Sequence, residues 1–245
     1  MSRFFTRPLP EHLDIDAGDG PPMRVRLRRD SRARRYLLRV PPDHSGPVLT
    51  VPENGSRTRA EKFLLQHLGW LRDRLVDRPA PVPLVAGNLV PVRGKPHLIV
   101  PTGGLRGIVS ANHSDDAGPQ LLVPGETAHI PRKVLAYLKK EARSDLTRIA
   151  DQHARTIGKT ITGLSVRDTR SRWGSCTSTG RLSFSWRLIL APPEILDYVA
   201  AHEVAHLVEM NHSARFWRLC EQLAPQTPHA RRWLKTYGSH LHAHG

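Results

Sequence analysis

The sequence predicts an α+β protein: a β-rich N-terminal region with one helix, followed by a compact core with a small antiparallel sheet and a histidine-bearing helix. Two observations predict this class. Short β-type runs dominate residues 23–125, and a long amphipathic segment follows from Pro131. The chain has 245 residues, of which 39% are hydrophobic and 24% charged, so it can bury a sizeable core in one or two domains.

The chain divides by its pattern into four segments. We expect an N-terminal tail over residues 1–22, a β-rich region over 23–125, a second domain over 131–238 and a histidine-rich tail over 239–245. The last of these, HLHAHG, is expected to be an exposed terminus that binds metal weakly and lies outside any active site. No repeat and no low-complexity tract is visible.

The N-terminal region is predicted from alternation and helical spacing. Apolar residues alternate with arginines from Met23, and YLLRV and VLTVPE continue in β-type composition. A helix is expected to begin behind Ser56, which can cap it, and to end by Pro79. Residues 80–125 return to short β runs broken by proline and glycine.

The second domain opens with a long amphipathic helix that begins at Pro131 and closes at Gly158. LSVRD is a candidate strand, and RLSFSWRLIL, residues 181–190, alternates as a second strand of a sheet that we expect to be antiparallel. Pro192 and Pro193 end that strand and open a helix that continues through the run HEVAHLVEM.

The charge balance is strongly basic, with 37 Lys and Arg against 22 Asp and Glu. Eight arginines face one aspartate in residues 23–40. This block is either a solvated strand face or a surface that contacts nucleic acid or a nucleotide. Tyr36 is its lone aromatic, so the pattern of interleaved aromatics that stack bases is missing from it.

The expected localisation is the cytoplasm, with no membrane partner. No apolar run approaches the roughly 20 residues needed to span a bilayer, and the N-terminus has no apolar core of a signal peptide. Cys176 and Cys220 are the only cysteines, which is too few for a disulfide scaffold and suits a reducing compartment.

The run HEVAHLVEMNH carries the most specific chemical signal. His202 and His206 are four residues apart, so on a helix both imidazoles project from one face within reach of a single ion. Glu203 lies about 100° round the axis from His202, beside the ion, where it can take a proton from water. His212 is the third candidate ligand, and three nitrogens leave a fourth zinc position open, as in a catalytic site.

The same spacing occurs in metzincins, but two features exclude that family. Metzincins have glycine at the third position after the second histidine, and this chain has Glu209 there. They also need a downstream Met-turn, and the only methionines are Met1, Met23 and Met210.

The run from Ser171 to Trp217, with RRWLKTYG behind it, resembles the YgjP-like metallopeptidase family, which is related to the WLM and SprT-like zinc peptidases. The resemblance implies a zincin-like core of three strands beside the H-E-x-x-H helix, with one zinc ion per chain. It also implies that His202, His206 and His212 are the zinc ligands and that Glu203 is the general base. Ser185 departs from the asparagine that relatives commonly have in this pattern.

Other residues near the motif are candidates for contacts with substrate or with a developing oxyanion. Arg172 could hold a carboxylate, a phosphate or the oxyanion, and Tyr198 and His229 could donate a hydrogen bond in the transition state. Trp173 is expected to pack in the core, and Cys176 to be a buried small residue.

Three function classes remain open from the sequence. The first is a zinc metallopeptidase acting on a polypeptide substrate, and it ranks first because the motif resembles peptidases. The second is a pyrophosphatase-type nucleotide phosphohydrolase that uses the same site. The third is a metal-stabilised binding module, which the intact Glu203 disfavours because a structural zinc needs no general base.

Overall fold

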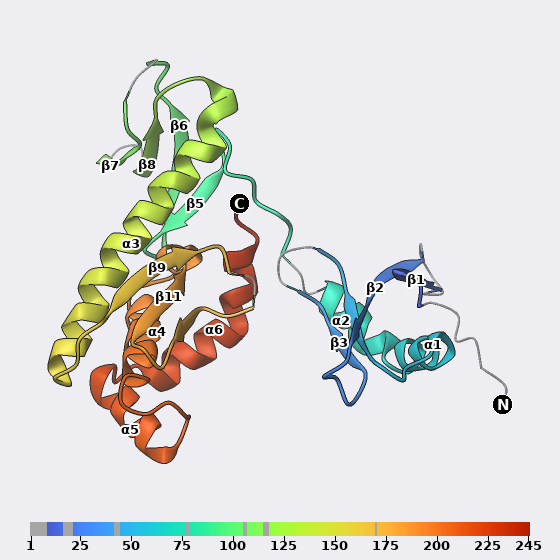
Figure 1. Cartoon of the computed structure of the whole chain (residues 1–245). Coiled ribbons are helices and arrows are strands. Elements are labelled where there is room, and N and C mark those ends of the chain that lie inside the picture. Colours follow the sequence, from blue (N-terminus) through green and yellow to red (C-terminus); the bar gives the residue numbers. More distant parts are fainter. Residues whose placement is uncertain are drawn as a thin grey trace, which may run out of the picture. The chain divides into compact units, whose positions relative to one another are not determined.

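Two compact units make up the protein, residues 1–79 and residues 80–245 (Figure 1). The structure is a computed structural model. It describes the following parts of the chain: residues 9–16, 22–41, 45–76, 79–104, 107–114, 118–169 and 171–245. Residues 80–125, expected as part of the β-rich N-terminal region, instead belong to the second unit, because their buried side chains, such as Val90 and Leu121, lie in its core.

The first unit is a four-stranded sheet with helices packed on one face. Its elements are β1 (His12–Ile15), β2 (Met23–Asp30), β3 (Leu37–Arg39), β4 (Val48–Pro52), α1 (Arg57–Gln66) and α2 (Leu68–Val76). The strand order is β1-β2-β4-β3, with the central pair parallel and both outer pairs antiparallel. Val25, Leu27 and Leu49 point inward to a core that they share with Leu64 of α1.

The helical segment of this unit begins as predicted but is divided. The Ser56 hydroxyl accepts a hydrogen bond from the backbone N–H of Arg59 at 3.3 Å, as an N-cap does. The helix expected to run unbroken stops at His67, whose ring stacks on Phe63 and whose Nδ1 lies 2.8 Å from the Phe63 carbonyl oxygen. This side-chain contact with the backbone accompanies the break between α1 and α2.

The second unit begins with a sheet of the same topology. Its strands are β5 (Leu89–Val92), β6 (Lys95–Pro101), β7 (Ser110–Ser114) and β8 (Gly118–Val123). The order is β5-β6-β8-β7, again with a parallel central pair between antiparallel outer pairs. The chain therefore repeats one strand arrangement. The repeat is hidden in the sequence because little beyond LTVP in β4 and LLVP at the end of β8 is shared.

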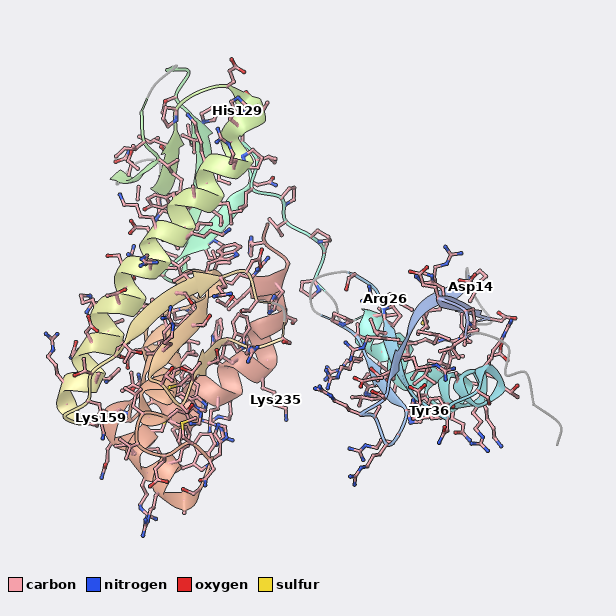
Figure 2. The ribbon with its side chains drawn as sticks, in the orientation of Figure 1. Asp14, Arg26, Tyr36, His129, Lys159 and Lys235 are labelled. Atoms are coloured by element: carbon pink, nitrogen blue, oxygen red, sulfur yellow. The ribbon has the colours of Figure 1, made fainter. Side chains whose placement is uncertain are left out.

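One long helix, α3 (Ile130–Thr156), runs past both sheets of the second unit (Figure 1). Pro131 lies in its first turn, and Gly158, with φ of 64°, follows its C-cap, as the sequence predicts. Its buried face contacts β8, β9 and the helix that carries the histidine motif. In Figure 2 the label on Lys159 marks the end of this helix.

The sheet beside the histidine motif is mixed, which corrects the antiparallel expectation. Its strands are β9 (Gly163–Arg167), β10 (Gly174–Cys176) and β11 (Arg181–Ser185), in the order β10-β11-β9. β10 pairs with β11 antiparallel, but β9 pairs with β11 parallel. The reason is tertiary: β9 lies on the far side of β11 from the β10–β11 hairpin.

The predicted strand over residues 181–190 ends early. Its second half, Trp186–Leu190, is the 3₁₀ helix η2, and all five side chains are buried, so the apolar alternation that suggested a strand does not set its conformation. The buried Ser185 hydroxyl accepts from the backbone N–H of Arg187 at 3.4 Å and caps η2. The residue that departs from the family pattern thus has a structural partner.

Three helices complete the unit: α4 (Pro193–Ala205), α5 (Ala214–Leu223) and α6 (Thr227–His242). The histidine-rich tail is not an exposed terminus. His242 is buried with its ring 4.8 Å from that of Trp173, and His244 forms a β-bridge with Val82. Among the described residues, none of the helices is both long and apolar enough to cross a membrane.

Candidate metal centre

Helix α4 carries the first half of the histidine motif. Pro193 opens the helix and Glu194 lies in its first turn, where a carboxylate favours the positive end of the helix dipole. His202 lies in the last turn, and Glu203 follows it on the buried side of the helix. On α3, His153 faces α4, and its Nε2 atom lies 2.8 Å from Oδ1 of Asp197. This contact joins the two helices.

The chain leaves α4 at His206, which is the C-cap of the helix. The Nδ1 atom of His206 lies 2.9 Å from the Glu209 carbonyl oxygen, an acceptor, so Nδ1 must carry the proton and donate it. This tautomer leaves Nε2 with a free lone pair, as in metal-binding histidines whose other nitrogen donates to a carbonyl.

His212 is positioned by the capping residues of α5. The Asn211 side chain accepts from the backbone N–H of Ser213 at 3.1 Å, and the Ser213 hydroxyl accepts from the backbone N–H of Phe216 at 3.2 Å. These two bonds turn the chain tightly between the helices. His212 lies inside the turn and so returns toward α4.

The three histidines meet at one point. Their ligand nitrogens all lie within 4.8 Å of one another, and the Nε2 atoms of His202 and His212 are 3.1 Å apart. A tetrahedral zinc with Zn–N bonds of about 2.0–2.1 Å places its nitrogens about 3.3 Å apart. Burial lowers the pKa of His202 to about 4 and lowers that of His206, so both rings are neutral near pH 7, as a metal ligand requires. The donor set therefore fits a zinc ion.

Phe216 forms an apolar floor under the three imidazoles, and the sequence reasoning missed it. Its ring is fully buried, with its centroid 4.9 Å from that of His202, 4.5 Å from that of His206 and 4.7 Å from that of His212. Only its position four residues after His212, at the start of an amphipathic helix, could have suggested this role. Such packing restricts ring rotation in all three histidines.

The Glu203 side chain is buried against strand β10. It is 5% exposed, and a Cβ added to Gly174 would lie 2.5 Å from its Oε1 atom, so glycine is needed at that position. Burial raises the pKa of Glu203 to about 7, and the positive charge of Arg172 partly opposes the shift. A carboxyl group with such a pKa can both accept and release a proton near neutral pH.

The other predicted site residues lie at different distances from this centre. The Tyr198 hydroxyl is 3.4 Å from Nδ1 of His202, and burial raises the Tyr198 pKa to about 12, so the hydroxyl keeps its proton. Arg172 is close enough to Glu203 to affect its pKa. His229 is exposed on α6 and stays outside the histidine cluster.

Two further side chains clarify the surroundings of the centre. Arg231 of α6 lies over the ring of Trp217, 4.1 Å from its centroid, and its charge helps to lower the pKa of His202. The Cys176 thiol lies near Glu203, and burial raises its pKa to about 11, so the thiol stays protonated. Cys176 is not part of the group of metal-binding side chains found among the described residues.

Comparisons with known proteins add a family to this geometry. The family described as "YgjP-like, metallopeptidase domain" matches residues 34–237. The crystal structure of the metallopeptidase zymogen of Pyrococcus abyssi abylysin has 18% sequence identity and a TM-score of 0.34, with 37% of this chain and 92% of that chain covered. None of the curated proteins matches the chain.

Proposed function

Because the chain belongs to the YgjP-like metallopeptidase family, we propose that it hydrolyses peptide bonds at the histidine centre of its second unit. His202, His206 and His212 would hold one zinc ion, and Glu203 would be the general base. The observation that carries the proposal is that three imidazoles converge, while Glu203, the residue after His202, has a buried carboxyl group against Gly174. A structural zinc site would need neither the open position nor this carboxylate.

Each residue has a task that follows from its surroundings. When bound, zinc supplies Lewis-acid polarisation of the substrate carbonyl and makes water at the site more acidic. Glu203 takes the proton of the attacking water and passes it to the leaving amine. Phe216 and Tyr198 hold the imidazoles in place.

We infer that a polypeptide substrate binds along an edge of the mixed sheet. Strand β11 is the central strand of this sheet and is paired on both sides, so it offers no free edge to a peptide. Strand β10 is the edge strand that contacts α4, and its Gly174 touches Glu203. A substrate that adds to β10 by main-chain hydrogen bonds would pass the carboxylate.

Replacing Glu203 with glutamine tests the mechanism. Glu203→Gln removes the base but keeps the shape and touches no ligand, so metal content should stay at one ion per chain while cleavage of an unfolded protein falls by about 10²-fold or more. Glu221→Gln, an exposed glutamate on α5, is the matched control and should keep full activity. Wild-type turnover by Glu203→Gln would remove this residue from the mechanism.

Replacing His206 with alanine tests the ligand set. The variant should lose nearly all bound zinc, because two imidazoles hold the ion much more weakly than three; His240→Ala, an exposed histidine on α6, should keep it. Full zinc content in His206→Ala would show that the ligands are assigned wrongly.

Metal- and Glu203-dependent hydrolysis of nucleoside triphosphates, without any peptide cleavage, would overturn the peptidase proposal and favour the phosphohydrolase alternative.

A further inference from the structure

The β9–β11 sheet carries a pocket that the proposed mechanism does not use. The cavity has a volume of about 270 Å³ and is lined by residues of all three strands and of the segment before β10. The polar residues that define it are Ser165, Arg167, Arg172, Ser175, Arg181 and Ser183.

The pocket lies on the face of the sheet opposite Glu203. Side chains alternate between the two faces of a strand, and Gly174 faces Glu203, so Ser175 points to the other face. Register places Ser175 beside Ser183, and Ser183 beside Ser165. Three serine hydroxyls therefore form one row across the sheet. The apolar neighbours Leu182 and Phe184 point to the core side.

The charges around this row are all positive. Arg181 lies over Gly163, where a Cβ would be 3.7 Å from its guanidinium carbon, so its charged group lies along the sheet. Arg167 donates to the Ser165 hydroxyl at 3.4 Å. None of the lining residues that the structure describes is acidic, and Asp168, which directly follows Arg167, is paired with Arg187.

Such a grouping of like charges has an electrostatic cost that an anion would remove. Among the described residues, Arg167, Arg172 and Arg181 form no ion pair with a carboxylate. Guanidinium groups offer forked N–H donors that match the oxygens of carboxylate and phosphate, and the serine hydroxyls add further donors. A concave site with both kinds of donor suits an oxyanion better than a metal or an apolar ligand.

We propose that this pocket binds an oxyanion group, a carboxylate or a phosphate. The group can come from an acidic side chain of a polypeptide or from a small phosphate compound free in solution. Arg167 and Arg181 supply the charge, and Ser183 and Ser175 supply hydroxyl donors from the floor. The Ser165 hydroxyl donates to the Leu182 carbonyl oxygen at 3.5 Å and accepts from Arg167, so it positions that arginine. Arg172 lines the pocket and its charge also reaches Glu203, but the row of serines lies on the face of the sheet opposite Glu203. Binding to this row is therefore measured without peptide hydrolysis.

The test is direct binding to the full-length, metal-loaded protein by isothermal titration. Inorganic phosphate is one probe, and a short glutamate-containing peptide with its glutamine counterpart is the other. The Arg167→Ser/Arg181→Ser variant should weaken binding about tenfold or more, because it removes two charged hydrogen-bond donors. The matched control is Arg143→Ser/Arg148→Ser, which removes the same charge from the exposed face of α3 and should bind like wild type.

A second variant separates local charge from loss of folding. Ser183→Asp places a carboxylate in the middle of the row and should abolish binding of either probe while zinc content stays unchanged. Phosphate binding alone would identify a free phosphate compound as the source, and glutamate-peptide binding alone would identify an acidic polypeptide. Absence of binding by both probes, or equal weakening in the pocket variant and in its α3 control, would overturn the proposal.

Discussion

The two four-stranded sheets share one strand order and one set of strand directions, but their outer faces have different chemistry. In the first unit, β2 points Arg26 and Arg28 outward, and Figure 2 labels Arg26 on this strand. In the second unit, Val100 pairs with Leu122 on the corresponding face, and both are half-buried. The shared topology depends on the apolar inner faces, so the outer face was free to differ.

The helices that follow the two sheets also differ in what they hold. Helix α1 packs on the sheet of its own unit, whereas α3 continues past its sheet to contact β9, α4 and η2. The β5–β6 turn is fastened to α3 by Arg93, whose guanidinium group lies 2.9 Å from Glu141 and 2.8 Å from Asp145. One strand arrangement therefore forms a separate module in the first unit and supports the histidine centre in the second.

Replacing one buried leucine in each unit with alanine tests most directly whether only the second unit supports the histidine centre. Leu64 of α1 and Leu138 of α3 are both fully buried, so replacing either with alanine should cost about 2–5 kcal/mol of unfolding free energy in its own unit. We expect only Leu138→Ala to lower the temperature at which zinc is released and peptide cleavage stops. Thermal unfolding, with zinc release recorded in the same experiment, measures the loss of stability and the temperature of zinc release. An equal loss of zinc in Leu64→Ala would show that the units do not unfold separately.

The outer face of the first sheet allows a second, smaller effect to be measured. A groove of about 410 Å³ on this face has one acidic lining residue, Asp30, among five arginines: Arg28, Arg32, Arg34, Arg35 and Arg39. If this groove contacts nucleic acid, as the basic charge suggested, affinity should fall steeply with salt and depend little on base sequence.

Replacing Arg28, Arg34 and Arg35 with serine should then lower the slope of log K against log salt by about one for each phosphate that the variant no longer neutralises. Replacing the exposed Arg72 and Arg74 of α2 should change it less. Fluorescence titration with single-stranded and duplex DNA across a salt series measures the slope. An unchanged slope in the groove variant would leave the arginines as a solvated face.

The smallest expected effect concerns acid stability of the second unit. Burial, with the nearby charges of His240 and Arg187, lowers the pKa of His244, and its Nδ1 atom is buried without a partner among the described residues. The folded state therefore favours neutral His244. The contribution of neutral His244 to the free energy of unfolding is fully present above the ordinary histidine pKa of about 6.5. This contribution is lost as pH falls through the lowered pKa.

His244→Gln cannot take up this proton, so the second unit of the variant should lose less stability than wild type between pH 7 and pH 5. Chemical unfolding of metal-free protein at both pH values measures the difference. The first unit should respond alike in both proteins, and an identical pH dependence of the second unit would show that His244 does not titrate in this range.

Local features of this protein follow from the sequence alone. Ser56 caps a helix, Gly158 follows the end of another, and the four-residue spacing brings His202 and His206 to one side of a third. These features depend on residues within one or two turns of each other, whose geometry the backbone sets. The spacing also predicted that His212 would join the pair, and the structure brings it there.

Features that need distant partners were decided by the tertiary structure. The local sequence gives no signal for the parallel pairing of β9 with β11 or for the repeat of one strand order in two dissimilar sequences. The same holds for Gly174 against Glu203 and for Phe216 beneath the histidines. The sequence around a residue sets its position along a helix or strand. Which atoms of other elements its side chain contacts depends on how those elements pack to bury their apolar faces.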